Sequence, residues 1–215
     1  MVSEKKCDWK KSQALELQYH ITSEWRRSGD FMPQTELLFS EFGFTQKQYE
    51  GKVILDLGAG SQLRTAFFQD AYIIALEPLA VEFIAKVDNS NLYLADAIIN
   101  SSAEKFLPWL EHSIDFCISI NVLDHCYDFK TVCQNIFSYV KPGGGAFFSF
   151  DFHDEADDLH PLSLSFDDCI CIFKETGFAV AVSSKGFPDK FFKKYQVHSY
   201  GGGVALNFWL TKNTA

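Results

Sequence analysis

The chain has 215 residues and is 47% hydrophobic, which allows one large core and is short for two. Its net charge of −9 at pH 7 disfavours a nucleic-acid backbone as partner, and no apolar run approaches the ~20 residues of a membrane helix. Residues 1–7 also lack the apolar core of a signal peptide. We therefore expect a cytoplasmic protein that binds neither membrane nor nucleic acid, and whose oligomeric state the sequence leaves open.

The first 50 residues differ from the rest of the chain in their pattern. Apolar residues recur at helical spacing over residues 14–21 and again over residues 35–42, with glycine and proline between the two runs. We predict a helical N-terminal cap over residues 1–50 and a Rossmann-like core over residues 51–215.

Strand-like and helix-like runs alternate after residue 51. Strands are predicted near residues 53–57, 72–76, 92–95, 115–120 and 145–151, and helices near residues 61–68, 79–87, 102–111, 128–140 and 166–176. Two more strand-like runs, residues 177–183 and 204–210, follow without a clear crossover helix, which favours a late antiparallel strand. The alternation predicts an α/β fold with a doubly wound, mostly parallel sheet.

A buried strand runs into a glycine turn at residues 53–61, VILDLGAGS. Gly58 and Gly60 let the backbone approach a ligand without an intervening Cβ, and Ser61 is placed to cap a following helix. The turn therefore predicts a nucleotide-cofactor site. The dinucleotide fingerprint would need a third glycine where this chain has Leu63, so a nicotinamide-dependent oxidoreductase is the weaker alternative.

The pattern Asp56-x-Gly58-x-Gly60 resembles the first motif of class I S-adenosylmethionine-dependent methyltransferases, which usually continues with a glycine where this chain has Gln62. The run VKPGG at residues 140–144 resembles the Leu-Lys-Pro-Gly-Gly marker of the same family. The resemblance covers roughly residues 51–211. It implies a seven-stranded sheet with an antiparallel last strand, and S-adenosyl-L-methionine as cofactor.

The resemblance also implies which residues bind this cofactor. Glu77 ends the second strand and is expected to accept the two ribose hydroxyls, although an ordinary loop acid would fit the same position. Asp96 and Ala97 are expected at the adenine ring, with a turn cap as the alternative. The complete set of expected cofactor-binding residues is Asp56, Gly58, Ala59, Gly60, Glu77, Pro78, Asp96, Ala97, Asn121 and Val122.

Methyl transfer is an in-line displacement from an activated sulfonium, so positioning of the acceptor supplies much of the rate. A base is needed only for an acceptor that is protonated at neutral pH. His125 and His153 follow the fourth and fifth strands and are the candidate catalytic residues, although a structural role would explain either one. For His160 a packing role is favoured.

No metal site is predicted. The acidic run over residues 153–160 is typical of a solvated loop, so Asp151 and Asp154 are not favoured as ligands. Cys169-x-Cys171 is too isolated for a zinc site, and the six cysteines are best interpreted as buried free thiols.

We therefore expect methyl transfer from S-adenosylmethionine to an oxygen or nitrogen of a small molecule. A cofactor-binding scaffold without activity is the alternative within this fold, and the sequence does not identify the acceptor. Two regions are candidates for binding it. Residues 185–195 interleave basic and aromatic side chains, as a plain amphipathic helix also would, and the cap contributes Tyr19, His20, Trp25, Arg26 and Arg27.

Overall fold

The strands form one mixed sheet in the computed structural model, which describes residues 9–214. They are β1 (Val53–Leu57), β2 (Tyr72–Leu76), β3 (Ala97–Ile99), β4 (Ile114–Ile120), β5 (Val140–Phe152), β6 (Ala179–Lys185) and β7 (Val204–Thr211). Their order across the sheet is β3-β2-β1-β4-β5-β7-β6. Strands β1 to β5 pair in parallel, and β7 is antiparallel to both β5 and β6. The predicted doubly wound sheet with an antiparallel last strand is confirmed.

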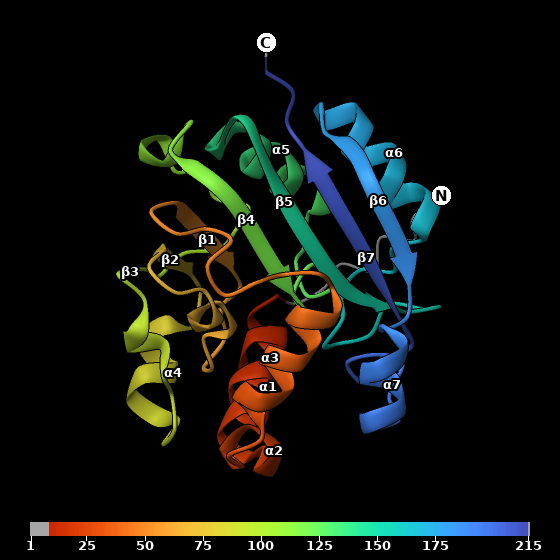
Figure 1. Ribbon diagram of the computed structural model, residues 1–215. Helices are drawn as coiled ribbons and strands as arrows, with labels where there is room; N and C mark the ends of the chain where they lie inside the picture. The colour runs from red at the N-terminus through yellow and green to blue at the C-terminus, as the bar shows by residue number, and fades with distance from the viewer. Residues whose placement is uncertain (1–8, 215) are drawn as a thin grey trace.

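Helices lie on both faces of the sheet and at one end of it (Figure 1). The cap consists of α1 (Trp9–Thr22), α2 (Glu24–Arg27) and α3 (Phe31–Glu41). The core helices are α4 (Ala80–Lys86), α5 (Phe129–Tyr139), α6 (Phe166–Thr176) and α7 (Asp189–Tyr195). Figure 1 shows α1 to α3 gathered at the end of the sheet toward which β4 runs. The predicted cap helices are present, while the division of the chain at residue 50 stays a prediction.

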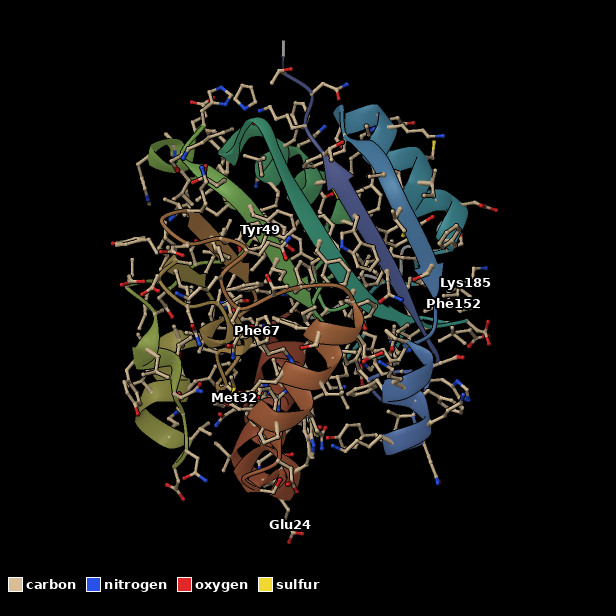
Figure 2. All side chains as sticks on the ribbon, in the orientation of Figure 1. Glu24, Met32, Tyr49, Phe67, Phe152 and Lys185 are labelled. Atoms are coloured by element: carbon tan, nitrogen blue, oxygen red, sulfur yellow. The ribbon has the colours of Figure 1, made fainter. Side chains whose placement is uncertain are left out.

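Aromatic side chains attach the cap to the sheet. Phe39 of α3 is fully buried, and its ring centroid lies 5.3–5.7 Å from those of Phe44, Phe67 and Phe68. The same cluster includes Phe147 of β5, and Figure 2 shows side chains filling the space between α3 and the sheet. The opposite face of the sheet packs against α5 and α6 through a larger apolar cluster. Burial on both faces explains the continuous apolar runs of the parallel strands.

Three of the predicted elements are wrong. Residues 92–95 form a 3₁₀ turn, Leu92–Leu94, and the strand follows at Ala97–Ile99. In place of the helix predicted near residues 61–68 there is a short 3₁₀ turn, Arg64–Phe67.

The helix predicted near residues 102–111 is also absent from that range, where only the 3₁₀ turn Pro108–Leu110 forms. Side chains of α5 form hydrogen bonds with the backbone groups of this segment instead. Asn135 donates to the carbonyls of Ala103 and Glu104, and the Tyr139 hydroxyl accepts from the amide of Leu107. These side-chain partners satisfy backbone groups that a helix would otherwise pair.

The cysteines of the described region are free thiols. As predicted, Cys117, Cys126, Cys133 and Cys169 are buried, whereas Cys171 is exposed, against the prediction. Cys7 lies outside the described residues. Within residues 9–214, no helix has both the length and the apolar character that a membrane crossing requires.

Candidate functional site

A cavity opens where the parallel strands end, between the sheet and the cap. It encloses about 870 Å³ counted to the solvent at its mouth, a size typical of small-molecule sites. The segments after β1 to β4 form one wall, and α1 and α2 contribute to the other. This is the edge at which open α/β sheets bind ligands. The predicted cofactor residues on the wall are Asp56, Gly58, Ala59, Gly60, Glu77, Pro78, Asn121 and Val122.

The loop after β1 requires glycine at two positions. Gly58 and Gly60 have φ angles of +69° and +64°, which side-chain-bearing residues rarely adopt. A Cβ on Gly58 would lie 2.3 Å from the Val122 side chain, and one on Gly60 would lie 3.1 Å from the His20 ring. The loop therefore passes close to both the sheet and the cap, as the glycine pattern indicates.

Glu77 holds this loop from the end of β2. Its carboxylate accepts hydrogen bonds from the amides of Gly60, at 2.9 Å, and Leu79, at 2.8 Å. The side chain is only 5% exposed, and burial raises its pKa from 4.5 to about 7, although the two hydrogen bonds act in the opposite direction. An ionised Glu77 retains lone pairs for hydroxyl donors in the cavity, whose wall it forms.

Two further polar residues lie at the strand ends. The Asp56 carboxylate accepts a 2.6 Å hydrogen bond from the Thr65 hydroxyl, and burial raises the pKa of Asp56 from 3.8 to about 6. Asn121, just after β4, has a φ of +59°, and its backbone N–H donates to the Ser149 carbonyl at 2.7 Å. Asparagine adopts this left-handed conformation more readily than most residues with a side chain, so it can turn the chain at the end of β4.

His20 of α1 closes the cavity over the glycine loop. Its Nδ1 accepts hydrogen bonds from the Ser61 amide and lies 2.7 Å from the Ser61 hydroxyl, so Nε2 carries the proton and donates to Glu16. Burial lowers the pKa of His20 from 6.5 to about 4. Its ring stacks on Phe83 at 4.3 Å. Ser61 thus binds the cap, and the prediction that it caps a helix is wrong.

Asp96 and Ala97 lie away from the cavity. Because β3 begins at Ala97, Asp96 precedes its strand and stands at the opposite edge of the sheet from the strand ends that line the cavity. Its carboxylate accepts a 2.7 Å hydrogen bond from the amide of Ile73 at the start of β2. The geometry therefore places Asp96 in a structural role, against the adenine prediction. The residues that follow β3 into the cavity are Ser102, Ala103 and Glu104.

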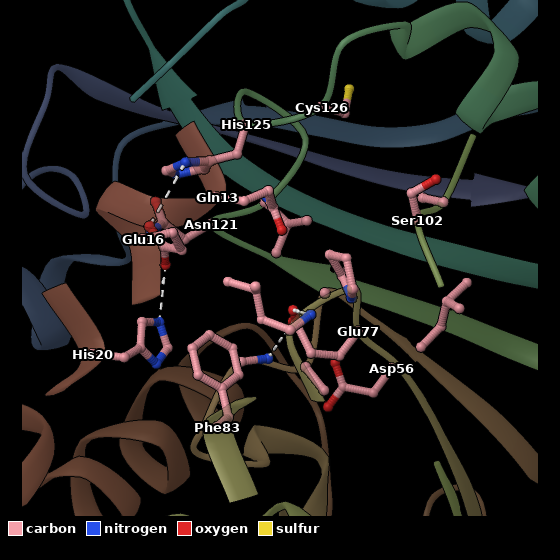
Figure 3. A pocket seen from close by; sticks show the side chains of 18 of the residues that line it. Gln13, Glu16, His20, Asp56, Glu77, Phe83, Ser102, Asn121, His125 and Cys126 are labelled. Atoms are coloured by element: carbon pink, nitrogen blue, oxygen red, sulfur yellow. Dashed lines mark hydrogen bonds and ion pairs between the residues drawn. The ribbon is translucent and has the colours of Figure 1, made fainter. Parts of the chain in front are cut away.

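The two candidate catalytic histidines are placed differently. His125 lines the cavity, with its Nδ1 4.0 Å from the Glu16 carboxylate; Figure 3 shows His20, Glu16 and His125 in a row. His153 is outside the cavity wall, buried, and 3.0 Å from the Asp124 carboxylate through Nε2. The hydrogen bond to Asp124 raises the pKa of His153. His153 therefore has no access to a reacting atom in this cavity.

A second cavity adjoins the first. It encloses about 980 Å³ counted to the solvent at its mouth, and Arg26, Arg64 and Asn121 line both cavities. Aromatic side chains from the cap, α7 and the segment before β7 form much of its wall: Tyr19, Trp25, Phe187, Phe191, Tyr195 and Tyr200. The second cavity therefore combines a cationic corner with aromatic surfaces, and both predicted acceptor regions contribute to it.

Several cavity residues were not predicted from the sequence. Gln13 and Glu16 accompany His20 on one face of α1, and Phe83 of α4 faces them. The spacing of three and seven residues from Gln13 marks one helical face, which is the signal that could have identified this group. In Figure 3, Gln13, Glu16 and His20 come from α1 of the cap and Phe83 from α4.

Comparisons with known proteins agree with this geometry. Residues 55–148 match the model of a methyltransferase domain family. No curated protein sequence matches the chain significantly.

Similar solved structures include the Burkholderia thailandensis 1,6-didemethyltoxoflavin-N1-methyltransferase with its bound substrate and S-adenosylhomocysteine. It is 15% identical over 95% of this chain and 88% of that one, with a TM-score of 0.61. An S-adenosylmethionine-dependent methyltransferase from Mesorhizobium loti is 14% identical over 83% and 98%, with a TM-score of 0.63. The [4+2]-cyclase SpnF is 14% identical over 97% of each chain, with a TM-score of 0.66. At such identities the likeness shows the fold alone.

The fold and the matched domain define a Rossmann-like methyltransferase. Residues 55–148 match the methyltransferase domain family, and the chain resembles the class I S-adenosylmethionine-dependent methyltransferases, a family of enzymes, as its motifs predict. Its cofactor is S-adenosylmethionine, which the glycine loop and the buried Glu77 fit. The match supports neither a nicotinamide cofactor nor a particular methyl acceptor.

Proposed function

We propose that this enzyme transfers the methyl group of S-adenosylmethionine to a small anionic acceptor bound in the second cavity. The observation that carries the proposal is the junction of the two cavities at Arg26, Arg64 and Asn121. A cofactor in the first cavity and an acceptor in the second would meet there.

The first cavity offers matching groups for each part of the cofactor. Glu77 would accept the ribose hydroxyls, and Asp56 with the glycine loop would receive the amino-acid end. Residues 102–104 would lie at the adenine. Arg26 would bind the carboxylate, because its Nη1 is 3.8 Å from the position of a Cβ on Gly60.

The arginines at the junction support an anionic acceptor. Among the described residues, no carboxylate lies within 4.0 Å of either guanidinium. Burial lowers the pKa of Arg64 from 12.5 to about 10, so it stays protonated at neutral pH. Desolvated charges are stabilised by partners of opposite sign, and the cofactor supplies only one carboxylate. The second guanidinium therefore calls for an anion on the acceptor.

Arg64 is held in place for this role. Its Nη1 donates to the Thr35 hydroxyl at 2.8 Å, and its guanidinium lies 4.3 Å above the Phe31 ring. A guanidinium fixed in this way binds a planar carboxylate in two-point fashion, and the surrounding aromatic rings favour a flat acceptor. Positioning by these contacts would supply much of the rate of an in-line methyl transfer.

The free state of the cysteines fits a protein that acts in the cytoplasm. Reducing conditions keep cysteines free, and the thiols of the described region form no disulfide.

Cofactor binding is tested by calorimetric titration with S-adenosylhomocysteine, with NAD and NADP as controls. One-site binding of S-adenosylhomocysteine alone supports the proposal. Binding without any methyl transfer, across a screen of acceptors, would favour the scaffold alternative. A response to NAD or NADP alone would contradict the proposal.

The acceptor class is tested with two probes of similar shape, 4-hydroxybenzoate and the neutral 4-hydroxybenzamide, in the presence of S-adenosylhomocysteine. We expect the enzyme to bind the benzoate at least tenfold more tightly and Arg64→Met to lose this preference. Lys193→Met, which removes an exposed cation from α7, is the matched control and should change nothing. Equal binding of the two probes would refute the anionic acceptor.

A further inference from the structure

Side chains able to ligate a metal gather beside the cofactor cavity. Asp124 and His125 follow β4, while His153 and His160 follow β5. The His160 ring stacks on His153 with centroids 3.9 Å apart, and the His125 ring lies 4.7 Å from that of His160. Two loops thus bring three imidazoles and one carboxylate together.

Two polar atoms in this cluster are buried and unsatisfied. Asp124 is fully buried; its Oδ2 lies 3.0 Å from Nε2 of His153, but its Oδ1 has no hydrogen-bond partner in the described part of the chain. Within the same region, Nε2 of His125 is likewise buried and unpartnered, 3.9 Å from Asp124 Oδ2. Polar atoms are rarely left in this state, and a bound cation would satisfy both.

The geometry of the cluster suits a metal ion. Asp124, His125 and His160 each offer one ligand atom, and these atoms all lie within 4.8 Å of one another. A small inward movement of the side chains would bring them to metal-ligand distances. Two imidazoles and a carboxylate form the ligand set of catalytic zinc and mononuclear iron(II) sites.

Each of the three ligands also has a polar neighbour. Nδ1 of His160 lies 3.2 Å from the Asp157 carboxylate, and Nδ1 of His125 lies 4.0 Å from that of Glu16. His153 holds the carboxylate of Asp124. Such partners orient metal ligands and are a regular part of metal sites.

We propose that Asp124, His125 and His160 bind a divalent transition-metal ion of the zinc and iron(II) type, with His153 as a positioning residue for Asp124. Three protein ligands leave coordination positions for water or for an oxygen of a bound molecule. Because His125 also lines the cofactor cavity, the ion would lie at the edge of that cavity.

The test uses the full-length protein, stripped with a chelator and titrated with Zn²⁺. We expect one Zn²⁺ per chain by calorimetry and by elemental analysis after gel filtration. Co²⁺ at the same site should give a visible absorption band without the intense sulfur-to-metal band of thiolate ligands. His160→Gln should weaken binding at least 100-fold, and His153→Gln should weaken it by about 10- to 100-fold.

Matched variants control for adventitious sites and for misfolding. His198→Gln removes an exposed histidine that stacks on Phe192, and Cys171→Ser removes the exposed thiol; neither should change the stoichiometry. Saturating Zn²⁺ should raise the Tm of the wild-type protein by several degrees and leave the Tm of His160→Gln unchanged. A folded wild-type protein that binds no Zn²⁺, or binding that survives His160→Gln unchanged, would overturn the proposal and leave the cluster as a hydrogen-bond network.

Discussion

Replacing Glu77 with glutamine should remove a loss of stability that occurs as the pH rises, and should weaken cofactor binding at the same time. Burial raises the pKa of Glu77 from 4.5 to about 7, so the folded protein binds this proton more tightly than the unfolded chain does. The free energy of unfolding therefore falls as the pH rises from about 4.5 to about 7. At ~1.36 kcal/mol per unit of pKa, ionisation of Glu77 costs the fold roughly 3 kcal/mol at pH 8. Glutamine avoids this cost but leaves one backbone amide, that of Gly60 or Leu79, without its acceptor, which offsets about 1–3 kcal/mol of the gain.

The cofactor should respond in the opposite direction. A glutamine presents one acceptor oxygen where an ionised glutamate presents two, so Glu77→Gln should weaken S-adenosylhomocysteine binding by about 1–3 kcal/mol at pH 8. Wild-type affinity should strengthen as the pH rises through 7, and the affinity of the variant should not.

Urea unfolding at pH 5 and pH 8 and calorimetry at pH 6 and pH 8 measure the two effects. The difference between wild type and variant isolates Glu77 from other titrating groups, such as Asp56. Equal loss of stability with pH in the two proteins would refute the reasoning about the pKa. Unchanged affinity in the variant would remove Glu77 from the ribose position.

Three substitutions test the packing that supports the site. Gly58→Ala combines a positive φ with a Cβ placed against Val122 and should lower the free energy of unfolding by about 2 kcal/mol or more. The control is Gly43→Ala, because Gly43 has a φ of +88° but open space around it, so its loss in thermal unfolding reports the backbone contribution alone. Phe39→Ala empties the fully buried centre of the aromatic cluster and should cost about 3–5 kcal/mol in urea unfolding, and a loss below 1 kcal/mol would contradict the cavity it creates. Ser165→Ala removes the side chain that accepts from the Asp168 amide at the start of α6, for a loss of about 1 kcal/mol by the same assay, with cofactor affinity unchanged.

The sheet could be predicted from sequence because its signals are local. The apolar runs of β1, β2, β4 and β5 are buried on both faces, and α5 and α6 carry clear apolar stripes. The failures occur where tertiary contacts replace local ones. Asn135 and Tyr139 hold residues 103–107 by hydrogen bonds without a helix. No pattern within that segment predicts hydrogen-bond partners about 30 residues away.

The candidate site divides in the same way. Gly58, Glu77 and Asn121 lie at strand ends, whose position follows from strand order; they line the cavity, and their contact with the cofactor stays a prediction. Asp96 was misplaced because a three-residue strand, β3, left its start ambiguous by a few positions. The cluster around Asp124 could not be predicted, since its histidines belong to loops whose meeting is a property of the fold.

The buried thiols allow local opening of this protein to be measured by chemical labelling. Burial raises the pKa of Cys117, Cys126 and Cys133 far above the ordinary value, so these side chains react only when solvent reaches them. Cys117 sits in β4, Cys133 in α5 and Cys126 on the wall of the cofactor cavity. With the exposed Cys171 replaced by serine, the labelling rate of each thiol would time the exposure of a different region. Slower labelling of Cys126 alone in the presence of S-adenosylhomocysteine would separate movement at the cavity from unfolding of the sheet.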